Sequence, residues 1–317
     1  MKATIGLDIG GTKILGVLYG ESGEELAREK KKTKASEGAD GVIKQIEKVL
    51  DALLSVEDIE LRGIGAGIPG IVSAKGEVKF SPNLPLQNFD LRKKLMEKYG
   101  VPSAVGNDVN VAMYGEYKHL QRPDLKNVLG LFVGTGVGGA IIVNGDLYVG
   151  QGGAGEFGHL VVQSDGAFCG CGGRGCLEAY ASKKAIQNFI LAQVKRGRET
   201  LLKSDVSDFG AVLKSSAIAD AYERGDTVTI EAVDRAVDAL GVAMGSLINL
   251  FNPQSIILGG GVMAAMGRQL EPKLYERTAL NSMPGLMETV KISFSELGDD
   301  AGAYGAYQLI EHELEAM

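Results

Sequence analysis

Three cysteines and one histidine lie close together in the sequence and could bind a metal ion. Cys169, Cys171 and Cys176 are all the cysteines of the 317-residue chain, and His159 precedes the first of them by ten positions. Thiolates and an imidazole are ligands that tetrahedral zinc prefers. Four protein ligands would fill the coordination sphere and leave no position for a reacting water. We therefore interpret the expected zinc as structural.

The spacing of the cysteines leaves other interpretations open. Glycines at 170, 172, 173 and 175 would let the backbone turn tightly enough for the sulfurs to face one point. The alternatives are an isolated zinc ribbon, or a disulfide with one thiol left over. An odd number of cysteines argues against a disulfide framework. The pattern C-x-C-x4-C is not a common zinc-finger spacing and gives that interpretation no support.

Two glutamates flank this metal segment. Glu156 lies three residues before His159, and Glu178 lies two residues after Cys176. A metal ion that holds the segment would fix the two carboxylates relative to each other. Carboxylate oxygens accept hydrogen bonds in pairs, which suits two neighbouring hydroxyls of a sugar ring. In the alternative interpretation both acids are simply solvated.

Two glycine–threonine turns could surround phosphate groups. Gly10-Gly11-Thr12-Lys13 follows Asp8, and Gly134-Thr135-Gly136 belongs to a second, similar stretch. The second stretch satisfies G-x-G-x-x-G, but a strand and a hairpin turn follow it where a Rossmann motif needs a helix. The first stretch is not a P-loop, and each turn alone could be an ordinary hairpin. Their duplication, and an acid at the strand end, favour a nucleotide with Mg²⁺.

Asp108 follows a buried strand and opens a helix, and Asn107 precedes it. Either residue could be only the helix N-cap. The alternative is that Asp108 is a carboxylate general base at the carboxyl end of a strand, where α/β proteins bind their ligands.

Hydrophobic periodicity predicts alternating strands and helices, which is typical of an α/β protein. Strands are expected near 3–9, 14–19, 24–33, 62–68, 101–105, 128–133, 140–143, 255–258 and 291–294. Helices are expected near 42–54 with Asp40 as N-cap, and near 90–99, 109–120, 182–196, 215–223, 231–251 and up to 315. A polar stretch extends to about Asp208.

The composition excludes several classes of protein. The chain has 45% apolar and 23% charged residues and a net charge of −7, so it carries no basic footprint for nucleic acid. The first residues do not resemble a signal peptide, and glycines interrupt the longest apolar stretch, near 128–143. Reduced cysteines are typical of the cytoplasm, where we expect the protein.

Taken in order, these motifs, with Leu258-Gly-Gly-Gly261, resemble those of the ROK family of sugar kinases and repressors. The resemblance extends from about residue 3 to 308 and is strongest in the metal segment. It implies two actin-like, ribonuclease-H-like domains, 1–118 with about 301–317 and 119–300, with the active cleft between them. It also implies a homo-oligomer, a dimer or tetramer. Phe157 and Ala140 depart slightly from the family pattern.

The resemblance also assigns roles to residues. Asp108 would be the catalytic base. The sugar would be held by Gly67, Asn83, Asn107, Asp108, Glu156, His159 and Glu178. ATP would be held by Gly10, Gly11, Thr12, Lys13, Gly134, Thr135, Gly136 and Gly260, with Mg²⁺ linked to Asp8 through water.

We therefore predict an ATP-dependent kinase that phosphorylates the 6-hydroxyl of a hexose, with glucose as the first candidate. N-acetylglucosamine, N-acetylmannosamine, mannose and allose stay open as substrates. A sugar-sensing repressor would need a helix-turn-helix ahead of the first strand, which begins by residue 3. Because the nucleotide turns are distant in sequence from the metal segment, we expect ATP binding to survive loss of the metal better than sugar binding does.

Overall fold

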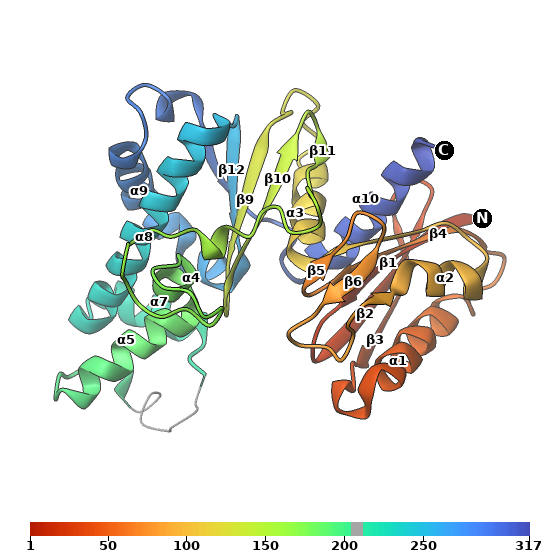
Figure 1. Cartoon of the computed structure of the whole chain (residues 1–317), viewed down its shortest axis with the longest axis horizontal. Coiled ribbons are helices and arrows are strands. Elements are labelled where there is room, and N and C mark those ends of the chain that lie inside the picture. Colours follow the sequence, from red (N-terminus) through yellow and green to blue (C-terminus); the bar gives the residue numbers. More distant parts are fainter. Residues whose placement is uncertain (204–211) are drawn as a thin grey trace.

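The computed structural model describes residues 1–203 and 212–317 and contains two five-stranded sheets (Figure 1). The first comprises β1 (Lys2–Ile9), β2 (Lys13–Gly20), β3 (Glu25–Lys32), β4 (Glu60–Ile68) and β8 (Ser103–Asn107). The second comprises β9 (Val128–Val133), β10 (Val137–Val143), β11 (Asp146–Leu147), β12 (Ser255–Gly259) and β13 (Lys291–Phe294). A smaller sheet, which the sequence did not predict, comprises β5 (Ile71–Val72), β6 (Glu77–Phe80) and β7 (Phe89–Asp90).

The two large sheets share one topology. The strand orders are β3-β2-β1-β4-β8 and β11-β10-β9-β12-β13. In each sheet an antiparallel meander (β1 to β3, or β9 to β11) continues into two parallel strands. The two glycine turns join the first two strands of each meander, so the repeat seen in the sequence is a repeat of the fold.

Helices cover both sheets (Figure 1). Near the first sheet lie α1 (Gly38–Leu53), α2 (Leu91–Tyr99), α3 (Asp108–His119) and α10 (Ala301–Glu315). Near the second lie α4 (Glu178–Ala181), α5 (Lys183–Lys195), α7 (Ser215–Glu223), α8 (Thr227–Phe251) and α9 (Gly260–Asn281). Buried aliphatic side chains form a separate core around each sheet.

Helix boundaries differ from the prediction in two places. Asp40 is not the N-cap of α1, because a short 3₁₀ turn (Ala35–Glu37) leads directly into the helix at Gly38 and leaves Asp40 in its first turn. Helix α8 begins earlier than predicted, at Thr227, because the side chain of Asp226 caps it by accepting from the Thr229 N–H at 2.7 Å. The polar stretch predicted up to about Asp208 lies partly in 204–211, outside the described residues.

Helix α9 was not predicted. It contains Pro272, which normally ends a helix because it lacks an N–H and crowds the preceding turn. Here Pro272 and Arg268, whose carbonyl loses its helical partner, both lie on the exposed side. Water can solvate that carbonyl, while Val262, Met266 and Leu270 stay buried on the opposite side.

Small residues let α10 lie directly on the first sheet. A Cβ atom at Gly6 or Gly65 would collide with backbone carbonyls of α10, those of Ala303 and Ala306. This close approach brings Gly302, at the start of α10, next to the carboxylate of Asp8 at the end of β1. The grouping of 301–317 with the first domain stays a prediction, which this packing supports. Among the described residues, no helix combines the length and apolarity that a bilayer span requires.

Candidate functional site

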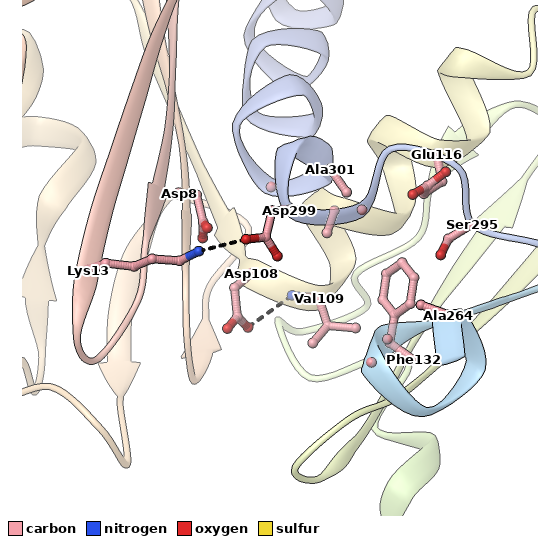
Figure 2. A pocket seen from close by; sticks show the side chains of 15 residues that line it. Asp8, Lys13, Asp108, Val109, Glu116, Phe132, Ala264, Ser295, Asp299 and Ala301 are labelled. Atoms are coloured by element: carbon pink, nitrogen blue, oxygen red, sulfur yellow. Dashed lines mark hydrogen bonds and ion pairs between the residues drawn. The ribbon is translucent and has the colours of Figure 1, made fainter. Parts of the chain in front are cut away.

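Two adjoining cavities lie between the sheets. The larger, of about 900 Å³, is lined by Asn83, Asn107, Asp108, Gly134, Thr135, Gly136, Glu156, His159 and Glu178, among others. The smaller, of about 400 Å³, is lined by Asp8, Lys13, Asp108, Glu116, Asp299 and Gly302, among others (Figure 2). Asp108, Val109, Phe132 and Gly260 line both cavities. Asp108 thus stands where the two cavities meet.

Asn107 caps helix α3 and leaves Asp108 available for chemistry. The Oδ1 atom of Asn107 accepts from the Asn110 N–H at 3.0 Å, and its Nδ2 atom donates to the Gly70 carbonyl at 2.9 Å. One oxygen of Asp108 accepts from the adjacent Val109 N–H at 2.9 Å. The interpretation of Asp108 as a mere cap is therefore wrong. Burial, and to a lesser extent Glu156, raise the pKa of the Asp108 carboxyl, which strengthens it as a proton acceptor.

Asp8 is the most strongly shifted carboxyl at this junction. Burial, reinforced by the nearby Asp108, raises its pKa to about 6, although Lys13 opposes the shift. Lys13 reaches across the smaller cavity to Asp299, with 3.3 Å between Nζ and Oδ2 (Figure 2). Two carboxylates beside one lysine suit a ligand that brings its own phosphates and a divalent cation.

The four predicted metal ligands converge. One ligand atom from each of His159, Cys169, Cys171 and Cys176 lies within 4.8 Å of the others. The Cys171 and Cys176 sulfurs are 3.8 Å apart, and His159 Nδ1 is 3.7 Å from the Cys169 sulfur. A disulfide needs about 2.05 Å between its sulfurs, and all three cysteines are free thiols in this structure, which does not contain the alternative disulfide. Sulfurs bound at about 2.3 Å to a tetrahedral zinc would be about 3.8 Å apart, so this donor set fits zinc.

The metal segment folds as the sequence suggests. Gly172 and Gly175 have φ values of 89° and 76°, which favour glycine, and a Cβ at Gly175 would collide with the Gln163 carbonyl. Since Nδ1 of His159 faces the sulfurs while the residue lines the larger cavity, its Nε2 atom is available to a ligand there.

The metal segment and the residues after it contact the second glycine turn, a link that the sequence did not predict. Oε2 of Glu178 accepts from the Val137 N–H at 3.0 Å, and the Lys183 N–H donates to the Gly134 carbonyl at 2.9 Å. Residues just after the cysteines therefore hold the second glycine turn. The sequence did not reveal this link, because the turn between β9 and β10 and the residues of α4 and α5 are distant along the chain and meet only in the folded protein.

Four of the predicted site residues lie near the two cavities but line neither of them. Gly67 pairs with Asp8 and Gly106 inside the first sheet and lines neither cavity. Gly10, Gly11 and Thr12 form the turn between β1 and β2 and also line neither, although a Cβ at Gly11 would lie 3.1 Å from that of Asn83. Their contacts with a ligand stay predictions.

Comparison with known proteins decides the family. The ROK family model matches residues 4–313 of the chain. The chain belongs to the ROK family. A glucokinase of Thermotoga maritima is 35% identical over 98% of this chain and 98% of its own length. A xylose repressor of Caldicellulosiruptor bescii is 29% identical over 96% of this chain and 77% of its own length.

The fold comparison agrees with this assignment. The chain superposes on a ROK family glucokinase of Streptomyces griseus, solved in complex with glucose and AMPPNP, with a TM-score of 0.80 and 31% identity. The match covers 97% of this chain and 98% of the glucokinase. The predicted two-domain, actin-like fold of the ROK family is therefore confirmed.

Several cavity-lining residues were not predicted from the sequence, among them Glu116, Asp299, Phe132 and Ser295. Glu116 lies eight positions after Asp108 on α3, so helical spacing (108, 112, 116) could have revealed it. Asp299 belongs to the stretch Gly298-Asp299-Asp300-Ala301-Gly302, whose two acids between glycines could have indicated a site. Phe132 and Ser295 have no distinguishing pattern in the sequence.

Proposed function

We propose that this ROK protein is an ATP-dependent kinase that transfers the γ-phosphoryl group of ATP to the 6-hydroxyl of a hexose, with glucose as the first candidate. The observation that carries the proposal is the position of Asp108 at the junction of the two cavities. The larger cavity offers carboxylates, amides and an imidazole to sugar hydroxyls. The smaller cavity offers Lys13, and Asp8 and Asp299 beside it, to the triphosphate end of a nucleotide and its cation.

The chemistry assigns Asp108 one task. As the hydroxymethyl oxygen of the sugar attacks the γ-phosphorus, the Asp108 carboxylate accepts its proton, the new O–P bond forms, and the bond to the β-phosphate oxygen breaks to release ADP. Burial favours this step because it raises the proton affinity of the carboxylate. Asn107, fixed by two hydrogen bonds, would hold the sugar beside Asp108.

Three side chains of the second domain would bind the sugar. Glu156 and Glu178 would accept hydrogen bonds from ring hydroxyls, and Nε2–H of His159, whose Nδ1 faces the metal site, would donate to a sugar oxygen. Asn83, from the loop after β6, lines the same cavity and would also contact the sugar. The AMPPNP and glucose bound together by the Streptomyces griseus relative support a cavity pair that takes both substrates.

The nucleotide would lie along the two glycine turns. Gly10 to Lys13 and Gly134 to Gly136 would contribute backbone N–H groups and hydroxyls, with Gly260 at the start of α9. Asp8 would hold Mg²⁺ through water, and the cation would supply positive charge to the phosphates. The structural metal would be zinc, held by His159 and the three cysteines, and it takes no part in bond-making.

A coupled assay of ADP formation with glucose, mannose, allose, N-acetylglucosamine and N-acetylmannosamine tests the proposal. We expect turnover with at least one, and glucose first. Sugar binding without any ADP formation would instead favour a sugar-sensing repressor. The expected dimer or tetramer stays a prediction, which light scattering measures.

A further inference from the structure

The segment that returns the chain from the second sheet to α10 forms one wall of the smaller cavity. In the described part of the chain, the path crosses to the second sheet after α3 and returns through residues 295–300. Ser295, Gly298 and Asp299 of this returning segment line the cavity, and so do Ala301 and Gly302 at the start of α10. The position of this segment therefore sets the width of the cavity beside Asp8.

Glu116 of α3 holds this segment at its midpoint. Its Oε2 atom accepts from the Glu296 N–H at 2.9 Å, and its Oε1 atom accepts from the Leu297 N–H at 3.1 Å. The residue is only 3% exposed. A buried carboxylate that bonds two successive backbone N–H groups is a strong, directional anchor, because removing it leaves two part-buried donors without this partner.

The anchor lies where the segment changes from one domain to the other. One residue earlier, the Ser295 N–H donates to the Leu258 carbonyl at the end of β12, at 2.9 Å. Two residues after Leu297, Asp299 pairs with Lys13 of β2 (Figure 2). Glu116 thus joins α3, which carries Asp108 at its first residue, to the point about which the segment would pivot.

We infer that Glu116 is a positioning residue for the nucleotide: by fixing Glu296 and Leu297 against α3, it sets the distance between the returning segment and the Asp8–Asp108 junction. This inference rests on the proposed function, since it takes the smaller cavity to hold the nucleotide phosphates. Glu116 does not touch the reacting atoms; it acts through the segment it anchors. No role in the sugar cavity follows, because Glu116 does not line it.

The test compares Glu116→Gln with a matched control. Glutamine keeps the shape of the Glu116 side chain, but its amide has only one oxygen. That oxygen can accept from one of the two N–H groups, of Glu296 or Leu297, while the amide NH₂ group faces the other. The control is Glu311→Gln on α10, where the lost carboxylate bonds Arg62 and Thr4 and lines neither cavity. For Glu116→Gln we expect the KM for ATP to rise about tenfold, with kcat and the glucose Kd measured without nucleotide changing much less. Glu311→Gln should leave the KM for ATP unchanged.

Hydrogen exchange gives a second measurement that does not depend on catalysis. The Glu296 and Leu297 amides should exchange faster in Glu116→Gln than in the wild type and in Glu311→Gln. Glu116→Asp keeps the charge on a shorter stem and should give intermediate values of KM and exchange; it carries the same test if Glu116→Gln fails to fold.

Unchanged exchange at 296–297, or an equal rise in the KM for ATP in both glutamine variants, would overturn the inference. If the wild type phosphorylates no hexose, the proposed function fails. The exchange measurement then still decides whether Glu116 anchors the segment.

Discussion

The Oε2 atom of Glu178 accepts a hydrogen bond from the backbone N–H of Val137, at 3.0 Å. This contact joins the residue that follows the metal-binding cysteines to the end of the second glycine turn. A Cβ atom at Gly136 would collide with the same oxygen. One carboxylate therefore lines the proposed sugar site and also contacts the proposed phosphate turn, so we expect the binding of metal, sugar and nucleotide to be coupled through Glu178.

Two substitutions at Glu178 should separate these roles. Glu178→Gln can still accept from the Val137 N–H but loses the charge offered to the sugar, so we expect weaker glucose binding with ATP affinity nearly retained. Glu178→Ala removes both, and each affinity should fall about tenfold or more. Calorimetric titration with glucose and with AMPPNP measures both. Equal ATP affinities in the two variants would show that the Val137 contact has no effect on the turn.

Zinc content and ligand affinity should change together. Purified protein should contain about one zinc per chain, because four ligands complete one tetrahedral shell. Cys171→Ser should lower the zinc content and weaken binding of both sugar and nucleotide, since Glu178 loses its anchor. His159→Cys should still bind zinc, because a thiolate replaces the imidazole as the fourth ligand, but it should bind sugar more weakly because the imidazole Nε2 is lost. Elemental analysis that finds no zinc in a fully active protein would contradict this account.

Asp108→Asn keeps the shape of the site but removes the base. We expect kcat to fall by about 10²–10⁴, with glucose affinity much less affected. Asp90→Asn is a matched control, because Asp90 is likewise an aspartate at the start of a helix, where it accepts from the Lys93 N–H at 2.9 Å, but it lies outside both cavities. Near-normal turnover of Asp108→Asn would exclude the proposed mechanism.

Gly134→Val tests the second glycine turn without disturbing its support. A Cβ at Gly134 would meet no atom within 4 Å, whereas one at Gly136 would collide with Glu178. We therefore expect Gly134→Val to fold normally and to weaken AMPPNP binding, because its side chain occupies space that the phosphates need. Gly153→Val, at another uncrowded glycine, is the control. Equal loss of glucose and AMPPNP binding would indicate a general disturbance instead.

Much of the fold and the site follows from local patterns. The strands at both glycine turns, helix α3 and the metal ligands are encoded by contiguous periodicity or by residue types with few other uses. Helix α9 was not predicted because it contains Pro272. A proline is tolerated there because it lies on the exposed side of the helix, which the local sequence does not reveal. Glu116 and the Glu178–Val137 contact escaped because each joins segments that only the tertiary fold brings together.

The raised pKa of Asp8 predicts a conflict between function and stability. The carboxyl has a pKa of 3.8 in the unfolded chain and about 6 in the folded protein, chiefly because of burial. The folded state therefore binds the proton more tightly, and stability is lost as the pH rises from about 4 to above 6. At 1.36 kcal/mol per unit, the ionised group costs of the order of 2–3 kcal/mol at pH 8.

Asp8→Asn should remove this cost while it impairs catalysis. We expect the variant to have a higher free energy of unfolding in urea than the wild type at pH 8, and a gain smaller by about 1 kcal/mol at pH 5. Asp124→Asn is the control, since Arg122 holds the pKa of that exposed carboxyl at about 2, and its loss should stabilise the protein at neither pH. If Asp8→Asn raised the free energy of unfolding by the same amount at pH 5 and pH 8, burial of the ionised carboxylate would not be the cause. Another contact of residue 8 would then explain the added stability.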